Sequence, residues 1–175
     1  VLRCTAKLLK KLKINGKPGE PDAQENPLGE WYADIETWRR QAFVVMINAR
    51  TGVVLMLPGN AAGLKNLLLA AAKQFLELCG HFGVSGAGVE QEAAALAQGF
   101  AIGPTGNRSL LGSINERKLA GQLLLERGST LGEVAEMEWT GLFRLPGAKA
   151  TLGERHSWFM PHDLVVAELM PQSAH

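Results

Sequence analysis

The sequence contains few cysteines. Cys4 and Cys79 are the two in 175 residues, and they lie far apart without forming a C-x-x-C pair. Disulfide-rich secreted domains and structural zinc sites use more numerous and more closely spaced cysteines. We therefore expect a chain from a reducing, cytoplasmic compartment that folds without disulfides, and we expect neither a metal nor another cofactor.

Long hydrophobic runs are missing as well. The longest apolar stretches, AFVVMI and NLLLAAAKQFLELC, are short or interrupted by polar residues, whereas a membrane-spanning helix needs about 20 apolar residues in succession. The sequence thus predicts no membrane span and no membrane partner. Because 46% of the residues are hydrophobic, the chain can bury a core of its own, and we expect a single domain over residues 1–175.

Acidic residues are absent from the N-terminal segment. Six of the 18 Lys and Arg residues lie within residues 1–17, whereas all 17 Asp and Glu residues follow them. An organellar transit peptide is also basic and poor in acids, but it is rich in serine and arginine, which this segment is not. We therefore expect the segment to be part of the fold.

The segment AKLLKKLKI has the pattern of a basic helix. Its leucines recur at helical spacing, and Thr5 is a suitable N-cap. The lysines can contact nucleic acid, an acidic protein or an anionic lipid, although such lysines more often form a solvated face. We keep Lys7, Lys10 and Lys11 as secondary candidates for binding.

The middle of the chain has the pattern of a β-hairpin. Two apolar runs, AFVVMIN and GVVLMLP, flank the turn sequence NARTG. Because successive rather than alternate residues are apolar, both faces of these strands need a cover of helices. A strand with alternating Trp31, Ala33 and Ile35 precedes the hairpin, and VLRCT and GFAIGPT predict two short strands.

Helical spacing of apolar residues recurs further along the chain. It predicts a helix over residues 60–80, with Asn60 as its N-cap and Gly80 as its stop. We expect other helices in VEQEAAALAQ, NRSLLGSINERKLAGQLLLERG, STLGEVAEMEW and PHDLVVAELM. The segment NGKPGEPDAQENP predicts an exposed connector. The predicted fold class is α+β, with a small mixed or antiparallel sheet that has a central hairpin and is packed by several helices.

The segment GPTGNRSLLGSIN carries the main candidate site. A strand ends there in a glycine-containing turn, and a helix begins with Asn107, Arg108 and Ser109 in its first turn. The free N–H groups and the dipole of a helix N-terminus favour negative charge, and an arginine adds a forked contact to phosphate or carboxylate. Asn115 lies two turns further along the same face. These four residues form a candidate anion-binding site.

A simpler interpretation of the same segment is structural, and it is the more common situation. Asn107 or Thr105 then merely caps the helix, Arg108 pairs with one of the chain's own carboxylates, and Gly112 allows close packing. Both interpretations stay open at the level of sequence.

Aromatic and basic residues are interleaved in LGEWYADIETWRR. Trp31 and Arg40 are of the types that stack on bases and neutralise phosphates of a single-stranded nucleic acid. Aromatic residues at the start of a strand are more often core anchors, and Glu30, Asp34 and Glu36 would repel a phosphate backbone. Packing is the expected role, and Trp31 and Arg40 stay as secondary candidates.

Catalytic signatures are not apparent. The sequence has no G-x-S-x-G or H-E-x-x-H motif, and the glycines of GHFGVSGAGVE lack the Lys-Ser or Lys-Thr pair of a phosphate loop. His81, His156 and Asp163 form a catalytic group only if the fold brings them together. Whether the protein is an enzyme stays open, and the sequence favours a non-enzyme.

Three pieces of the chain occur in a recognisable order: RCTAKLLKKLK, then PLGEWYADI with the following hairpin, then NRSLLGSIN. In this order they resemble a prokaryotic family classed as a domain of unknown function, of the DUF 6933 type. The resemblance covers about residues 2–125, and the tail from about residue 140 to 175 departs most. Members look like short stand-alone proteins, or like the leading part of longer chains whose second domain is associated with plasmids and transposons. The resemblance implies a bacterial setting and a compact fold, and no catalytic residues.

Three hypotheses for the function follow. The first is a small cytoplasmic binding or accessory protein of mobile-element or defence biology, which contacts a phosphate-bearing ligand or nucleic acid at Asn107–Ser109. The second is an unrecognised enzyme that acts on a nucleotide or nucleic acid, with Arg108 stabilising charge. The third is a protein–protein interaction module, in which the basic helix or an apolar patch docks a protein partner, including a second copy.

Overall fold

The computed structural model describes residues 1–14, 26–99, 101–142 and 159–170, and within them it contains five strands and seven helices. The strands are β1 (Leu2–Cys4), β2 (Trp31–Trp38), β3 (Gln41–Asn48), β4 (Val54–Pro58) and β5 (Ile102–Pro104). The helices are α1 (Ala6–Lys11), α2 (Ala61–Lys65), α3 (Leu67–His81), α4 (Ala87–Gln98), α5 (Arg108–Glu126), α6 (Leu131–Thr140) and α7 (Pro161–Leu169).

The strands form one mixed sheet in the order β4-β3-β2-β1-β5. β1 pairs in parallel with both β2 and β5, whereas β2, β3 and β4 are joined by antiparallel pairing. The predicted α+β class with a mixed sheet is therefore confirmed. The hairpin of β3 and β4 forms as expected, with β4 at one edge of the sheet and β2 in its centre.

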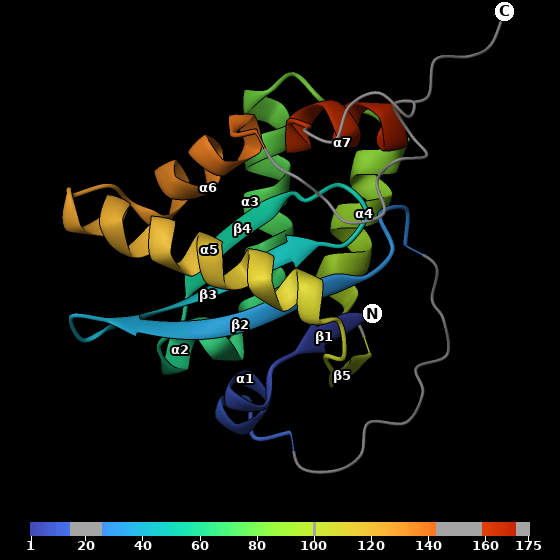
Figure 1. Ribbon diagram of the computed structural model, residues 1–175. Coiled ribbons are helices and arrows are strands. Elements are labelled where there is room, and N and C mark those ends of the chain that lie inside the picture. The colour runs from blue at the N-terminus through green and yellow to red at the C-terminus, as the bar shows by residue number, and fades with distance from the viewer. Residues whose placement is uncertain (15–25, 100, 143–158, 171–175) are drawn as a thin grey trace, which may run out of the picture.

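Helices cover both faces of the sheet (Figure 1). In this view α5 and α6 lie in front of the sheet, α3 and α4 lie behind it, and α7 lies at the top. α5 contacts β2 and β3, while α6 and α3 both contact β4. This arrangement explains why β3 and β4 are apolar on successive residues, because each face of these strands meets a helix.

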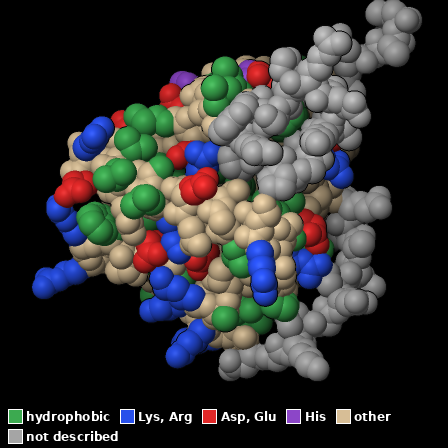
Figure 2. Space-filling view, viewed as in Figure 1, with side chains coloured by type: hydrophobic (Ala, Val, Ile, Leu, Met, Phe, Trp, Pro, Cys, Tyr) green, Lys and Arg blue, Asp and Glu red, His purple; other side chains and the backbone are tan. Residues whose placement is uncertain are grey.

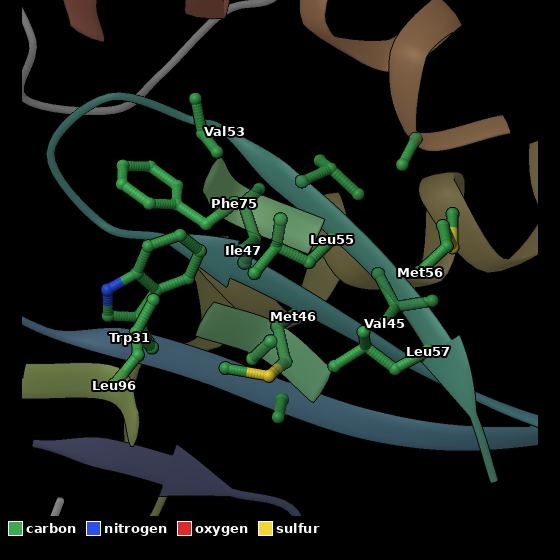
Figure 3. Close-up of a cluster of buried hydrophobic side chains, with 14 of the residues drawn as sticks. Trp31, Val45, Met46, Ile47, Val53, Leu55, Met56, Leu57, Phe75 and Leu96 are labelled. Atoms are coloured by element: carbon green, nitrogen blue, oxygen red, sulfur yellow. The ribbon is translucent and has the colours of Figure 1, made fainter. Parts of the chain in front are cut away.

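The hydrophobic core lies between the sheet and these helices, and Figure 3 shows the part around β3 and β4. Phe75 of α3 is fully buried there and meets the Trp31 ring edge-on, with ring centroids 6.2 Å apart. Its ring also lies 6.1 Å from that of Trp139 on α6. Gly121 of α5 faces the sheet, and a Cβ there would make ordinary contacts with Met56 and the Phe43 ring. Aromatic contacts thus connect β2, α3 and α6.

The outward backbone groups of the edge strand β4 are hydrogen-bonded to side chains. Gln74 of α3 accepts from Met56 N at 2.8 Å and donates to Met56 O at 2.9 Å. Trp139 Nε1 donates to Val54 O at 2.9 Å. A sheet edge with free N–H and C=O groups invites pairing with another chain, so these two side chains close the edge at Val54 and Met56.

The helix expected over residues 60–80 is instead two helices, α2 and α3, which meet at Asn66. Asn60 caps α2 as predicted, and its side chain accepts from Gly63 N at 2.8 Å. A Cβ at Gly63 would lie 2.2 Å from the last backbone oxygen of β4, so α2 lies directly against that strand. The apolar spacing runs through this break, and for that reason the sequence did not reveal it. α3 also continues past the predicted stop at Gly80.

The other predicted helices and strands form near their predicted positions. Most of the connector NGKPGEPDAQENP and residues 143–158 lie outside the described residues. None of the helices in the described ranges is long and apolar enough to cross a membrane.

Candidate functional site

The carboxyl ends of β1 and β5 meet beside the middle of β2, and α1 and α5 begin near this edge (Figure 1). Thr5 N donates to Ala33 O, and Thr105 N donates to Cys4 O, both at 3.1 Å. Thr5 therefore lies next to the strand position of Asp34, and Thr105 lies beside Thr5 on the other side of β1. Ligands of open α/β sheets bind outside the carboxyl ends of parallel strands, which makes this edge the first place to look for a site.

Asp34 is the centre of a polar cluster at this edge. Its carboxylate accepts hydrogen bonds from the Thr5 hydroxyl and, at 2.8 Å, from Ile35 N. Lys118 Nζ of α5 donates to it at 2.7 Å. Thr5 also accepts from Leu8 N at 3.3 Å, which confirms it as the N-cap of α1. Although Asp34 is only 7% exposed, it has the cation and the donors that a buried carboxylate needs.

Lys118 extends this cluster to Glu36 and Asn115. Its Nζ atom lies 3.1 Å from a Glu36 oxygen and donates to Asn115 Oδ1 at 3.2 Å, while Lys7 Nζ lies 3.3 Å from Glu36. Burial lowers the pKa of Lys118, but the hydrogen bonds and charges of Asp34 and Glu36 outweigh burial and raise the pKa above its usual value. The ammonium group stays charged, and two cations balance two carboxylates.

α5 begins about 15 Å before Lys118 along the helix axis, and its first turn has no acidic residue. Asn107 is its N-cap, and the side chain accepts from Ser109 N at 3.1 Å and from Leu110 N at 3.2 Å. Arg108 and Ser109 are exposed, and within the described ranges Arg108 forms no ion pair with a carboxylate. A side chain at Gly112 would meet open space, so this glycine does not serve close packing. The helix start therefore carries positive charge that no described acid offsets.

The candidate site thus consists of two parts, which lie at different positions along α5. Asn115 joins the Asp34 cluster through Lys118, whereas Arg108 lies seven helical residues earlier, about 10 Å along the axis. Figure 2 shows Lys and Arg side chains over α1 and near the start of α5. Between the two parts, Thr105 Oγ1 is buried and has no hydrogen-bond partner among the residues that the structure describes.

A family model described as Domain of unknown function (DUF6933) matches residues 1–141. The chain belongs to this family. The match covers the whole sheet and α1 to α6, and therefore both parts of the candidate site. Neither a curated protein nor a solved structure matches the chain.

In this DUF6933 chain, the position of the secondary candidate Trp31 argues against a binding role. Trp31 is fully buried, and its Nε1 donates to the Glu92 carboxylate at 2.8 Å. Glu92, which is also fully buried, accepts in addition from Asn26 Nδ2 and Leu28 N, each at 2.8 Å. The Trp31 ring is therefore not available to a base, because it packs in the core and helps to hold a buried carboxylate.

The basic candidates of α1 lie at the exposed end of that helix. Lys10 and Lys11 are in its last turn, where cations interact favourably with the helix dipole. A groove of about 330 Å³ runs between α1 and α2, and it is lined by Lys11, Leu12, Lys13, Ala61, Leu64 and Lys65. This groove is the most basic of the cavities described here. Lys7 instead pairs with Glu36 in the Asp34 cluster.

Arg40 lies at the other end of the molecule, in the turn between β2 and β3. Both Arg39 and Arg40 have positive φ, 43° and 71°, a conformation that costs most residues about 1–2 kcal/mol. Arg39 forms an ion pair with Glu126 at the end of α5. Arg40 lines a separate cavity of about 420 Å³ next to the start of α6. Arg40 is therefore remote from Arg108 and belongs to a different surface.

The residues considered for catalysis do not join the Asp34 cluster. His81 Nε2 lies 3.1 Å from Glu136 of α6, and the ring of Phe82 contacts both His81 and His162. Asp163 is near this group, whereas His156 lies outside the described residues. Burial raises the pKa of the Cys4 thiol to about 12, so this thiol stays protonated at neutral pH although it lies at the candidate edge.

Sequence reasoning missed Lys118 and its pairing with Asp34. Asp34 and Lys118 are separated by 84 positions, and no local pattern relates them. The available signal was the presence of acidic residues in the strand WYADIETW beside the apolar hairpin, because an acidic residue needs a partner when it is buried.

Proposed function

We propose that this DUF6933 protein is a small binding or accessory protein that holds a phosphate-bearing ligand at the start of α5. The observation that supports the proposal most is the exposed Arg108 on a long helix whose first turn has no acid. The carboxylates of Asp34 and Glu36, further along the helix, already have Lys118 as a cationic partner. Helix dipole and guanidinium therefore act together on an anion. Asn107 would orient the first turn, with Ser109 as a further donor to a ligand oxygen.

The setting of this function is part of the proposal. We propose a bacterial, cytoplasmic protein of mobile-element or defence biology, because of the family resemblance and because Cys4 and Cys79 are both free and buried. A nucleotide, a short oligonucleotide or another phosphate compound would fit the same chemistry.

A thermal-shift panel on the full chain tests the proposal. Nucleotides, inorganic phosphate and short oligonucleotides serve as probes at low ionic strength, where charge contacts are least screened. A ligand that binds the folded state raises Tm. We expect Arg108→Ala to leave the Tm of the free protein unchanged and to weaken binding about tenfold, which corresponds to one charge-assisted contact of about 1.4 kcal/mol.

Arg127→Ala is the matched control. Arg127 is the exposed C-cap residue of the same helix, at the end where the dipole repels anions. This variant should bind the ligand like the wild type. A panel without any Tm increase, or an equal loss in both variants, would remove the proposal.

The alternative of an enzyme has less support. It requires Arg108, Asn115 and a catalytic carboxylate or histidine to line one cavity. Asn115 does lie within reach of Lys118 beside Asp34. Neither Arg108 nor Asn115 lines any of the three cavities described in this structure.

A further inference from the structure

An open apolar groove of about 830 Å³ lies between α3 and α4, on the side of the sheet opposite α5 (Figure 1). Leu69 and Leu76 of α3 border it and are 61% and 45% exposed. Single exposed leucines are common on soluble proteins, and here two of them lie on one groove. The residues that line the groove are Asn66, Leu69, Ala70, Ala72, Lys73, Leu76, Glu90, Ala93, Ala94 and Ala97.

The two helices contribute complementary shapes to this surface. On α3, Leu69 and Leu76 are seven residues apart and therefore lie on one side of the helix, two turns from each other. On α4, the lining residues include Ala93, Ala94 and Ala97, whose short side chains leave room for a neighbour. The same surface thus offers protruding leucines on one helix and a shallow alanine-lined strip on the other.

The groove also carries charges of both signs, so that two copies of this surface can attract each other. Lys73 and Glu90 both line it, one on each helix, and Lys73 Nζ lies 3.7 Å from Glu77 of its own helix. A nucleic acid would require an excess of positive charge, which this surface lacks. A two-fold interface places each residue of a patch against another residue of the same patch. Opposite charges and opposite shapes within one patch are what such an interface needs.

We infer that a second copy of this chain docks on the α3–α4 surface and forms a symmetric four-helix interface. A two-fold axis parallel to the helices places α3 of one copy over α4 of the other. Leu69 and Leu76 then enter the alanine-lined strip of the partner, and Lys73 faces the acidic residue of the opposite α4. Helix pairs with an apolar stripe pack in this way in four-helix bundles. The inference is independent of the anion site at α5.

Sedimentation or light scattering on the full chain over a range of concentrations tests the interface. The wild type should be a dimer that dissociates on dilution. Because symmetry places each substitution in the interface twice, a tenfold loss at each site weakens the dimer about 100-fold. We expect this result for Leu76→Glu and for Ala94→Arg, while the circular dichroism spectrum of the monomer stays unchanged because both positions are exposed.

Leu119→Glu is the matched control, since Leu119 is 59% exposed on α5, on the other side of the sheet. It should leave the dimer intact. Lys73→Glu should weaken the dimer, and the double variant Lys73→Glu/Glu90→Lys should restore part of the lost affinity. A wild type that stays monomeric at every concentration overturns the inference. So does a dimer that Leu119→Glu dissociates as readily as Leu76→Glu does.

Discussion

The two halves of the sheet, here called the polar side and the apolar side, are stabilised by different means. Around β1, β5 and the first half of β2, a neutral network of charges centred on Asp34 and Lys118 ties α1 and α5 to the strands. Around β3 and β4, the contacts are apolar and aromatic, and the strand edge is closed by Gln74 and Trp139. A ligand site is expected where polar groups are not already used in hydrogen bonds or ion pairs within the protein. That condition holds near the start of α5 and does not hold at the β4 edge.

The largest expected effect concerns the apolar side. Trp139→Ala should lower the free energy of unfolding by about 3–5 kcal/mol, because it leaves a cavity next to Phe75. It also leaves Val54 O without its donor. Urea denaturation measures the loss. Trp139→Phe, which keeps a ring but not the hydrogen bond, should lose much less, and an equal loss would show that packing of the ring contributes little.

An intermediate effect is expected on the polar side. Lys118→Ala leaves the Asp34 carboxylate buried without its cation and should lower the free energy of unfolding by about 2–3 kcal/mol. The double variant Asp34→Asn/Lys118→Met should be more stable than Lys118→Ala, because it buries no uncompensated charge. Lys10→Ala, at an exposed lysine of α1, is the control and should change stability little. Equal stability of Lys118→Ala and Lys10→Ala would mean that the network does not hold the two helices.

The smallest expected effect is a dependence on acid pH that is specific to the polar side. Burial raises the pKa of Glu36, but the hydrogen bonds from Thr37 N, Lys118 and Lys7 outweigh it and hold the pKa below its usual value of 4.5. A carboxyl with a lowered folded pKa adds stability above its unfolded pKa and loses it as the pH falls through the folded pKa. Thermal unfolding should show a shallower decrease below about pH 4.5 in Glu36→Gln than in the wild type. Identical slopes would contradict this assignment.

Local features of the fold could be predicted from the sequence. Thr5, Asn60 and Asn107 each cap the helix that follows them, because a cap involves residues only two or three positions apart. The apolar runs of β3 and β4 also indicated helices on both faces correctly. These are short-range or compositional signals.

Features that depend on tertiary contacts could not be predicted in this way. α2 ends at its C-cap Asn66 and lies against the end of β4 at Gly63, a contact that no local pattern indicates. The pairing of Asp34 with Lys118 depends on how α5 crosses the sheet, and the burial of Glu92 depends on where the Trp31 segment meets α4. A single sequence does not show which distant residues become neighbours.

The parallel pairing of β1 has a consequence for the order of folding. β1 lies between β2 and β5, and Leu2 is aligned with Ile102 of β5. During synthesis, β1 and α1 precede β5 by most of the described chain, so this strand can gain its second neighbour only late. Until then, one row of its N–H and C=O groups has no strand partner. Completion of β5 also brings the start of α5 to the sheet, so the anion site proposed here comes into existence in the same late step.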